Sequence, residues 1–205
     1  MKKHLTIILI SLLIITTFIP VLAQEDQLEI TMDSLNGIIY RKTEQGFFEF
    51  FRIQVWTRLL DNATIKTGDI IKTAEDSQLI LNIGTNSKIE LEEASIVALG
   101  SNSTETSQLI EIKKGRVLVN STLNTNPDFN LEIETPDSTL ITEQAILEIE
   151  VNKYRTRILI EQGEITLTEK TTLNEVDFTA GQLAVIEDNE IKKYERVEFI
   201  TEVAL

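Results

Sequence analysis

The chain of 205 residues carries a formal net charge of −14 and contains one histidine and no cysteine. The histidine, His4, lies in an N-terminal segment that looks removable, so the mature chain would contain neither residue type. Their absence excludes a Ser-His-Asp triad, a thiol nucleophile, a zinc-finger ligand set and a haem-ligating histidine.

Residues 1–23 have the features of a secretory signal peptide. Two lysines follow Met1, and the apolar run from Leu5 to Ile19 is shorter than the roughly 20 residues that a membrane-spanning helix needs. Small residues then precede an expected cleavage point between Ala23 and Gln24. The alternative is an uncleaved N-terminal anchor. Either way, the sequence predicts an exported protein, periplasmic or extracellular.

The predicted mature chain, residues 24–205, is long enough for one domain with its own core. Cleavage removes two lysines and no acid, which leaves 17 basic and 33 acidic side chains and a charge of −16. Such a chain is repelled by nucleic acid and by anionic membrane surfaces. We therefore expect no nucleic-acid partner, and membrane contact only through the N-terminal segment if it stays uncleaved.

Alternating apolar and polar residues dominate the mature chain and predict half-buried strands. The clearest examples are residues 79–83, 129–134, 147–151 and 164–168. Turn signals separate these runs, at Asn36-Gly37, Gly68, Gly84, Gly100, Gly115, Gly163 and Gly181. The pattern predicts an all-β domain of many short strands, arranged as a β-solenoid or a sandwich.

Two segments, residues 110–119 and 158–167, are alike, since each has an apolar run, a glycine and a second apolar run. This arrangement predicts hairpin-like winding at Gly115 and Gly163, without fixing the strand order. The tail, residues 191–205, is ambiguous, because its apolar residues fit both strand alternation and helical spacing.

Several motifs in chain order resemble those of the FecR family of extracytoplasmic domains, over about residues 28–190. Two steps depart from the family pattern: Ile141–Ala145 stands where an R-G-T step is usual, and Asn86-Ser87 replaces a d-G-S turn. The segments that carry the resemblance are Leu35–Arg41, Thr64–Thr73, Asp76–Leu81, Asn86–Leu91, Gly115–Val119, Glu134–Ser138, Gln162–Leu167 and Thr179–Gln182.

The resemblance implies an all-β, solenoid-like domain that signals or binds without catalysis. The best-known members of the family relay an outer-membrane receptor signal to a segment that handles a sigma factor. Only Met1 to His4 precede the hydrophobic run, so we do not expect this chain to carry that cytoplasmic segment.

The densest aromatic cluster is the candidate binding site, and Phe48, Phe50 and Trp56 are its candidate partner-binding residues. The alternative is a segment buried on both faces. The cluster consists of Tyr40, Phe47, Phe48, Phe50, Phe51 and Trp56.

No catalytic residue, metal ligand or cofactor is predicted. Acidic pairs such as Glu92-Glu93 occur, but no D-x-D-x-D-G calcium loop does. The sequence therefore favours a non-catalytic binding or sensing module of the bacterial cell envelope, whose partner is an envelope protein or a glycan. Two alternatives remain: a carbohydrate-binding protein or glycosidase that uses Asp and Glu, and a structural envelope protein with a free sheet edge. An acid pair lining a concave groove would favour the glycosidase.

Overall fold

Period-two alternation becomes β-strand throughout the part of the chain that the computed structural model describes, which is residues 28–42, 56–85, 87–104, 106–122 and 129–195. The prediction of an all-β fold is confirmed. These ranges contain no helix that is long and apolar enough to cross a membrane. The strands are β1 (Ile30–Asn36), β2 (Ile39–Lys42), β3 (Trp56–Arg58), β4 (Ile70–Thr73), β5 (Gln78–Ile83), β6 (Ser87–Leu91), β7 (Ile96–Leu99), β8 (Ser107–Asn120), β9 (Asn130–Glu134), β10 (Ser138–Thr142), β11 (Ala145–Val151), β12 (Arg155–Glu169), β13 (Glu175–Thr179), β14 (Gln182–Glu187) and β15 (Glu190–Glu195).

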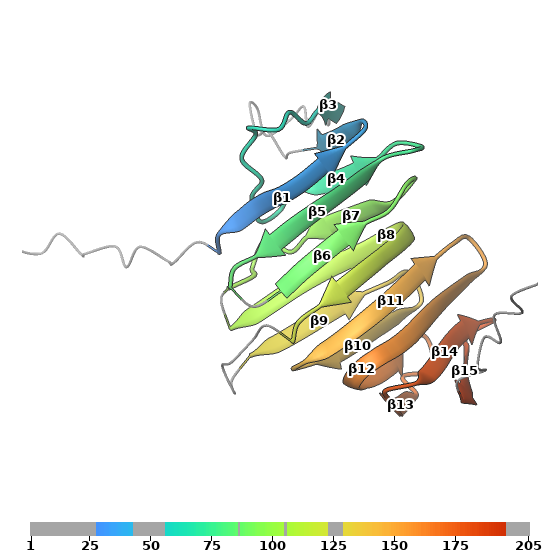
Figure 1. Cartoon of the computed structure of the whole chain (residues 1–205). Coiled ribbons are helices and arrows are strands. Elements are labelled where there is room, and N and C mark those ends of the chain that lie inside the picture. The colour runs from blue at the N-terminus through green and yellow to red at the C-terminus, as the bar shows by residue number, and fades with distance from the viewer. Residues whose placement is uncertain (1–27, 43–55, 86, 105, 123–128, 196–205) are drawn as a thin grey trace, which may run out of the picture.

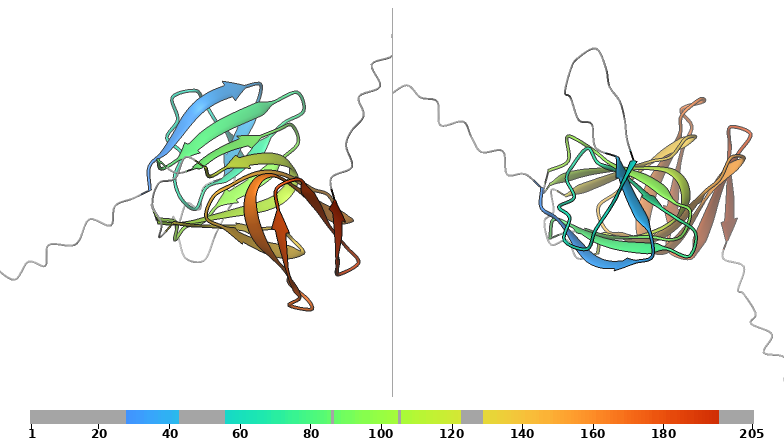
Figure 2. Two further views of the ribbon diagram at one scale, coloured as in Figure 1. Left: turned by 60° about the horizontal axis from the view of Figure 1, so that its bottom comes forward. Right: turned by 90° about the horizontal axis from the view of Figure 1, so that it is seen from above.

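The strands form two sheets that face each other. The first sheet has the order β1-β5-β6-β8-β11-β12-β14-β15. The second has the order β3-β2-β4-β7-β8-β9-β10-β12-β13. Among these pairings only that of β8 with β9 is parallel. The chain advances from β1–β3 at one end to β13–β15 at the other, as in a solenoid, while the paired layers are those of a sandwich (Figures 1 and 2).

The hairpins expected at Gly115 and Gly163 are wrong, because both glycines lie inside long strands. β8 pairs with β7 up to Lys114 and with β11 from Gly115 onward. β12 likewise leaves the first sheet after Gly163 and enters the second. Each glycine has a positive φ, +100° at Gly115 and +85° at Gly163, so the strand turns a corner there and continues. Two apolar runs separated by a glycine are therefore compatible with a corner in one strand as well as with a hairpin.

The core fills the space between the sheets. Every second residue of the strands points inward, for example Leu79, Leu81 and Ile83 in β5. Phe129 and Phe178 are the largest of the fully buried side chains. The alternation therefore assigns one face of each strand to the interior and leaves the other face on the surface.

Several expectations fall outside the described residues. They are the signal segment 1–23 with its cleavage point at Ala23 and Gln24, and the aromatic residues Phe48 and Phe50. Within the tail, the described residues Glu190–Glu195 form the strand β15, so helical spacing is wrong as far as Glu195. The alternating residues 197–203 lie outside the described residues.

Candidate partner-binding surface

Trp56, the candidate residue that the structure describes, lies on β3, which is the last strand of the second sheet among the described residues. Its side chain is exposed, with 39% of its surface accessible. It faces Lys42 on β2, whose Nζ lies 5.8 Å from the centroid of the indole ring. An ammonium group at this distance from an aromatic ring is attracted to the ring face.

The outward residues around Trp56 form a surface that we call the basic–aromatic face. Strand register places Tyr40 between Arg58 on β3 and Lys72 on β4. The same row continues from Lys72 to Ile96 on β7 and Lys114 on β8. The face consists of Ile38, Tyr40, Lys42, Trp56, Arg58, Leu60, Lys72, Ile96 and Lys114.

Buried side chains and hydrogen bonds on the inward side of the same strands hold these strands to the rest of the molecule. Ile39, Leu59 and Ile71 are buried beneath it. The Leu59 N–H donates to the Ile39 carbonyl at 2.8 Å, which continues the pairing of β2 and β3 past the end of β3. The guanidinium of Arg41 donates to the Thr64 carbonyl and lies 3.7 Å from the buried carboxylate of Asp69. The end of the sheet is therefore tied to the chain that follows it.

None of the nine residues of the basic–aromatic face is acidic. The neighbouring outward row runs from Trp56 and Lys42 through Ile70 and Ala98 to Glu111 on β8, whose carboxylate pairs with Lys113 Nζ at 2.8 Å. Among the described residues, no ion pair joins Lys42, Arg58, Lys72 or Lys114 to a carboxylate. As far as the structure describes the chain, these four cations are therefore available to pair with carboxylates of a partner.

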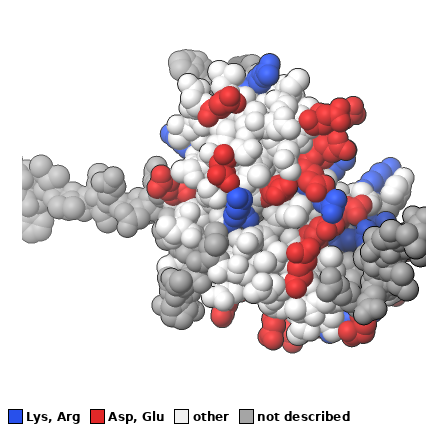
Figure 3. Space-filling view, viewed as in Figure 1, with Lys and Arg blue, Asp and Glu red and all other residues white. Residues whose placement is uncertain are grey.

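The outer face of the first sheet is different, because several of its cations are paired with carboxylates. Arg116 Nε lies 2.8 Å from Glu148 Oε1, and Arg116 Nη1 lies 3.2 Å from Glu92 Oε2. Arg157 Nη1 lies 3.0 Å from Glu150 Oε2. The hydrogen bond to Glu148 raises the pKa of the Arg116 guanidinium above its usual value. Figure 3 shows this side of the molecule, where acidic side chains form a band with basic ones among them.

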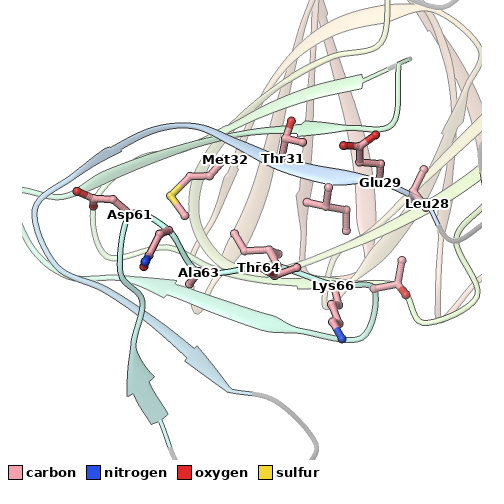
Figure 4. A pocket seen from close by; sticks show the side chains of 12 residues that line it. Leu28, Glu29, Thr31, Met32, Asp61, Ala63, Thr64 and Lys66 are labelled. Atoms are coloured by element: carbon pink, nitrogen blue, oxygen red, sulfur yellow. The ribbon is translucent and has the colours of Figure 1, made fainter.

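A hollow of about 650 Å³ lies at the same end of the molecule, between β1 and residues 61–67. Its lining mixes apolar side chains, such as Leu28 and Met32, with polar ones. The two carboxylates of the lining, Glu29 and Asp61, lie at opposite ends of the hollow (Figure 4). They do not form an acid pair.

A second hollow, of about 590 Å³, lies where the β10–β11 turn meets the corner of β12 and β13. It contains most of the step at Ile141–Ala145 that departs from the FecR pattern, and Glu143, Glu164 and Asp177 line it. Glu143 and Glu164 are exposed, and Asp177 Oδ1 accepts a hydrogen bond of 2.9 Å from the Thr166 hydroxyl. Within the described ranges, no group of three or more Asp, Glu, His or Cys side chains could hold a metal ion.

Sequence reasoning singled out Trp56 and missed Arg58 and Lys72. These residues lie 14 positions apart, and only the pairing of β2 with both β3 and β4 brings them to one row. The sequence signal that could have found them is the alternation itself, because it assigns Tyr40, Arg58 and Lys72 to the outer faces of their strands.

Comparison with known proteins gives a family match over part of the chain and a similar fold. Two crystal structures of a proposed anti-sigma factor from Parabacteroides distasonis ATCC 8503 are similar, with TM-scores of 0.55 and identities of 9% and 8%. Each alignment covers 62% of this chain and 59% of the solved chain, so the likeness is one of fold over part of each. No curated protein matches. The family model described as FecR protein matches residues 69–166, which confirms the resemblance to the FecR family that the sequence motifs indicate.

Proposed function

We propose that this protein is an exported, non-catalytic binding and sensing module of the bacterial cell envelope. The observation that carries the proposal is the basic–aromatic face, which exposes Trp56 at the end of the second sheet. Clusters of Trp, Tyr and Arg supply much of the binding energy at protein contacts. The FecR match over residues 69–166 is consistent with a sensing role. The fold of a proposed anti-sigma factor is consistent with it as well.

Export is supported by the signal-like residues 1–23, with their charged start, short apolar run and small residues before Gln24. The part of the protein that binds would then lie outside the cytoplasm. In this proposal the chain contributes an extracytoplasmic part of a sensing system.

The proposal is tested by capture from envelope extract with the mature chain, residues 24–205, as bait. The bait is compared with the Trp56→Ala variant and with the control Tyr154→Ala. Tyr154 is a matched control because it is 76% exposed and has Lys153 Nζ 5.5 Å from its ring centroid. We expect the same envelope proteins to be retained by the wild type and the control and to be lost with Trp56→Ala. Equal capture by all three baits, or no capture by the wild type, would refute the proposal.

A glycosidase is the second candidate, because Glu143, Glu164 and Asp177 line a hollow. A general acid of this class is usually buried in an apolar pocket that keeps it protonated, and Glu143 and Glu164 are exposed. The candidate predicts release of reducing sugar from cell-wall glycans that the double variant Glu143→Gln and Glu164→Gln abolishes. Release that is equal in both proteins, or absent from both, would exclude it.

A further inference from the structure

We infer that the basic–aromatic face binds an acidic polypeptide segment that carries apolar side chains among its carboxylates. The inference rests on the proposed function, since it names the partner chemistry of the same surface. It follows from three features of the described residues: unpaired cations, exposed apolar groups and the charge of the rest of the chain.

The cations are spaced so that their fields reinforce one another. Arg58, Lys72 and Lys114 occupy alternate strands of one row, with Tyr40 and Ile96 between them. Alternate strands of a sheet are about 9.5 Å apart. This separation is close to the screening length of about 8–10 Å at ordinary salt concentrations. A carboxylate placed over Tyr40 or Ile96 therefore lies within the field of two cations.

The apolar members of the face require a partner with apolar groups of its own. Ile38 and Leu60, at the ends of the two outer strands, are 39% and 61% exposed, and Trp56 lies at the other end of the β2–β3 pair. Ile38, Trp56 and Leu60 account for three of the seven large hydrophobic side chains that are exposed among the described residues. Burial of such groups stabilises a complex in proportion to the apolar area removed from water.

The charge of the whole chain argues for a polypeptide over a densely charged polymer. At −14, the protein repels nucleic acid and sulfated glycan at long range. A peptide segment with a few carboxylates is repelled less. It is also attracted by the cations of the face, and it can contact Ile38, Trp56 and Leu60. An acidic polypeptide with apolar side chains is therefore the class of partner that can pair with the cations and also bury the apolar groups of the face.

The single tryptophan of the chain makes the inference directly measurable, because all indole fluorescence comes from Trp56. The mature protein is titrated with a random copolymer of glutamate and tyrosine, with excitation chosen for tryptophan. Poly-L-glutamate tests charge alone, and dextran sulfate tests a glycan polyanion. We expect saturable binding in the order copolymer, poly-L-glutamate, dextran sulfate at about 150 mM salt, with weaker binding as salt rises.

Reversing the charge of one lysine of the face tests whether the copolymer binds there. We expect Lys72→Glu to weaken binding of the copolymer by about tenfold or more, since an attractive charge becomes a repulsive one. The control Lys193→Glu makes the same change in net charge on β15, at the opposite end of the strand order from β2 and β3, and we expect less than about a twofold effect. If Lys72→Glu does not fold, Lys72→Gln replaces it, and a thermal melt shows that this variant is folded before its binding is measured.

The outcomes separate this inference from the proposed function. No binding of the copolymer, tighter binding of dextran sulfate than of the copolymer, or equal losses from Lys72→Glu and Lys193→Glu would each overturn the inference. In any of these cases, Trp56-dependent capture from envelope extract would still support a binding module. The proposed function itself is refuted only if the wild type captures nothing or if Trp56→Ala captures as much as the wild type.

Discussion

The substitution Gly163→Ala tests the corner of β12, where the strand passes from one sheet to the other. A Cβ at this position would lie 2.0 Å from the carbonyl oxygen of Gln144, which is a backbone atom and cannot turn away. Gly68 is a close match, because its φ of +86° is almost the same as the +85° of Gly163. Its added Cβ would meet only the Ser101 Cβ at 3.7 Å, an ordinary contact. The pair therefore separates the cost of close approach from the cost of the backbone angle.

An alanine at positive φ costs about 1–2 kcal/mol, and we expect this loss in the free energy of unfolding for Gly68→Ala. Gly163→Ala adds the overlap with Gln144, for which overpacking of about 1–3 kcal/mol is typical. The difference between the two variants corresponds to a melting temperature lower by roughly 2–4 °C per kcal/mol for a chain of this size. Urea unfolding of both variants, followed by circular dichroism, measures it. Equal losses from the two substitutions would refute the argument that close approach selects glycine at the corner.

Two further predictions concern buried polar groups. Hydrogen bonds from the Thr172 hydroxyl and from the Thr171 and Thr172 N–H groups lower the pKa of Glu169 from 4.5 to about 2. The carboxylate therefore stabilises the fold above about pH 4.5, and this contribution is lost as the pH falls through about 2. The stability gap between the wild type and Glu169→Gln, measured by urea unfolding, should be constant at neutral pH and should narrow over that acid range; a gap that does not change with pH would contradict this. Thr73 is buried, donates to the Glu92 carbonyl at 2.6 Å and accepts from the Ser95 N–H at 2.9 Å, so Thr73→Val should cost about 1–3 kcal/mol in urea unfolding. The control Thr139→Val, on a half-buried outer face, should change stability by less than about 0.5 kcal/mol, and equal effects would argue against a role for these bonds.

Local alternation was enough to predict the strands. Residues 79–83 and 147–151 lie within β5 and β11, residues 129–134 closely match β9, and residues 164–168 form the second part of β12. In each case every second side chain is buried, because a strand between a core and solvent needs a period of two and little else.

The corners could not be predicted in the same way, since a glycine between two apolar runs suits both a hairpin and a bent strand. The difference lies in pairing over long distances, such as that of Val151 with Gly115 and of Ala145 with Gly163. The basic–aromatic face was missed for the same reason. Trp56 stands out in the sequence as an aromatic residue, whereas Arg58 and Lys72 gain their meaning only from the strands beside them.

The central claim is that this chain, which we propose is exported, binds a partner through the sheet end that carries Trp56. Site-specific photocrosslinking in living cells tests it most directly, with a photoreactive residue at position 56 in one version of the full chain and at position 154 in another. The account predicts a defined crosslinked species outside the cytoplasm from position 56 and none from position 154. No species from position 56, or the same species from both positions, would contradict it.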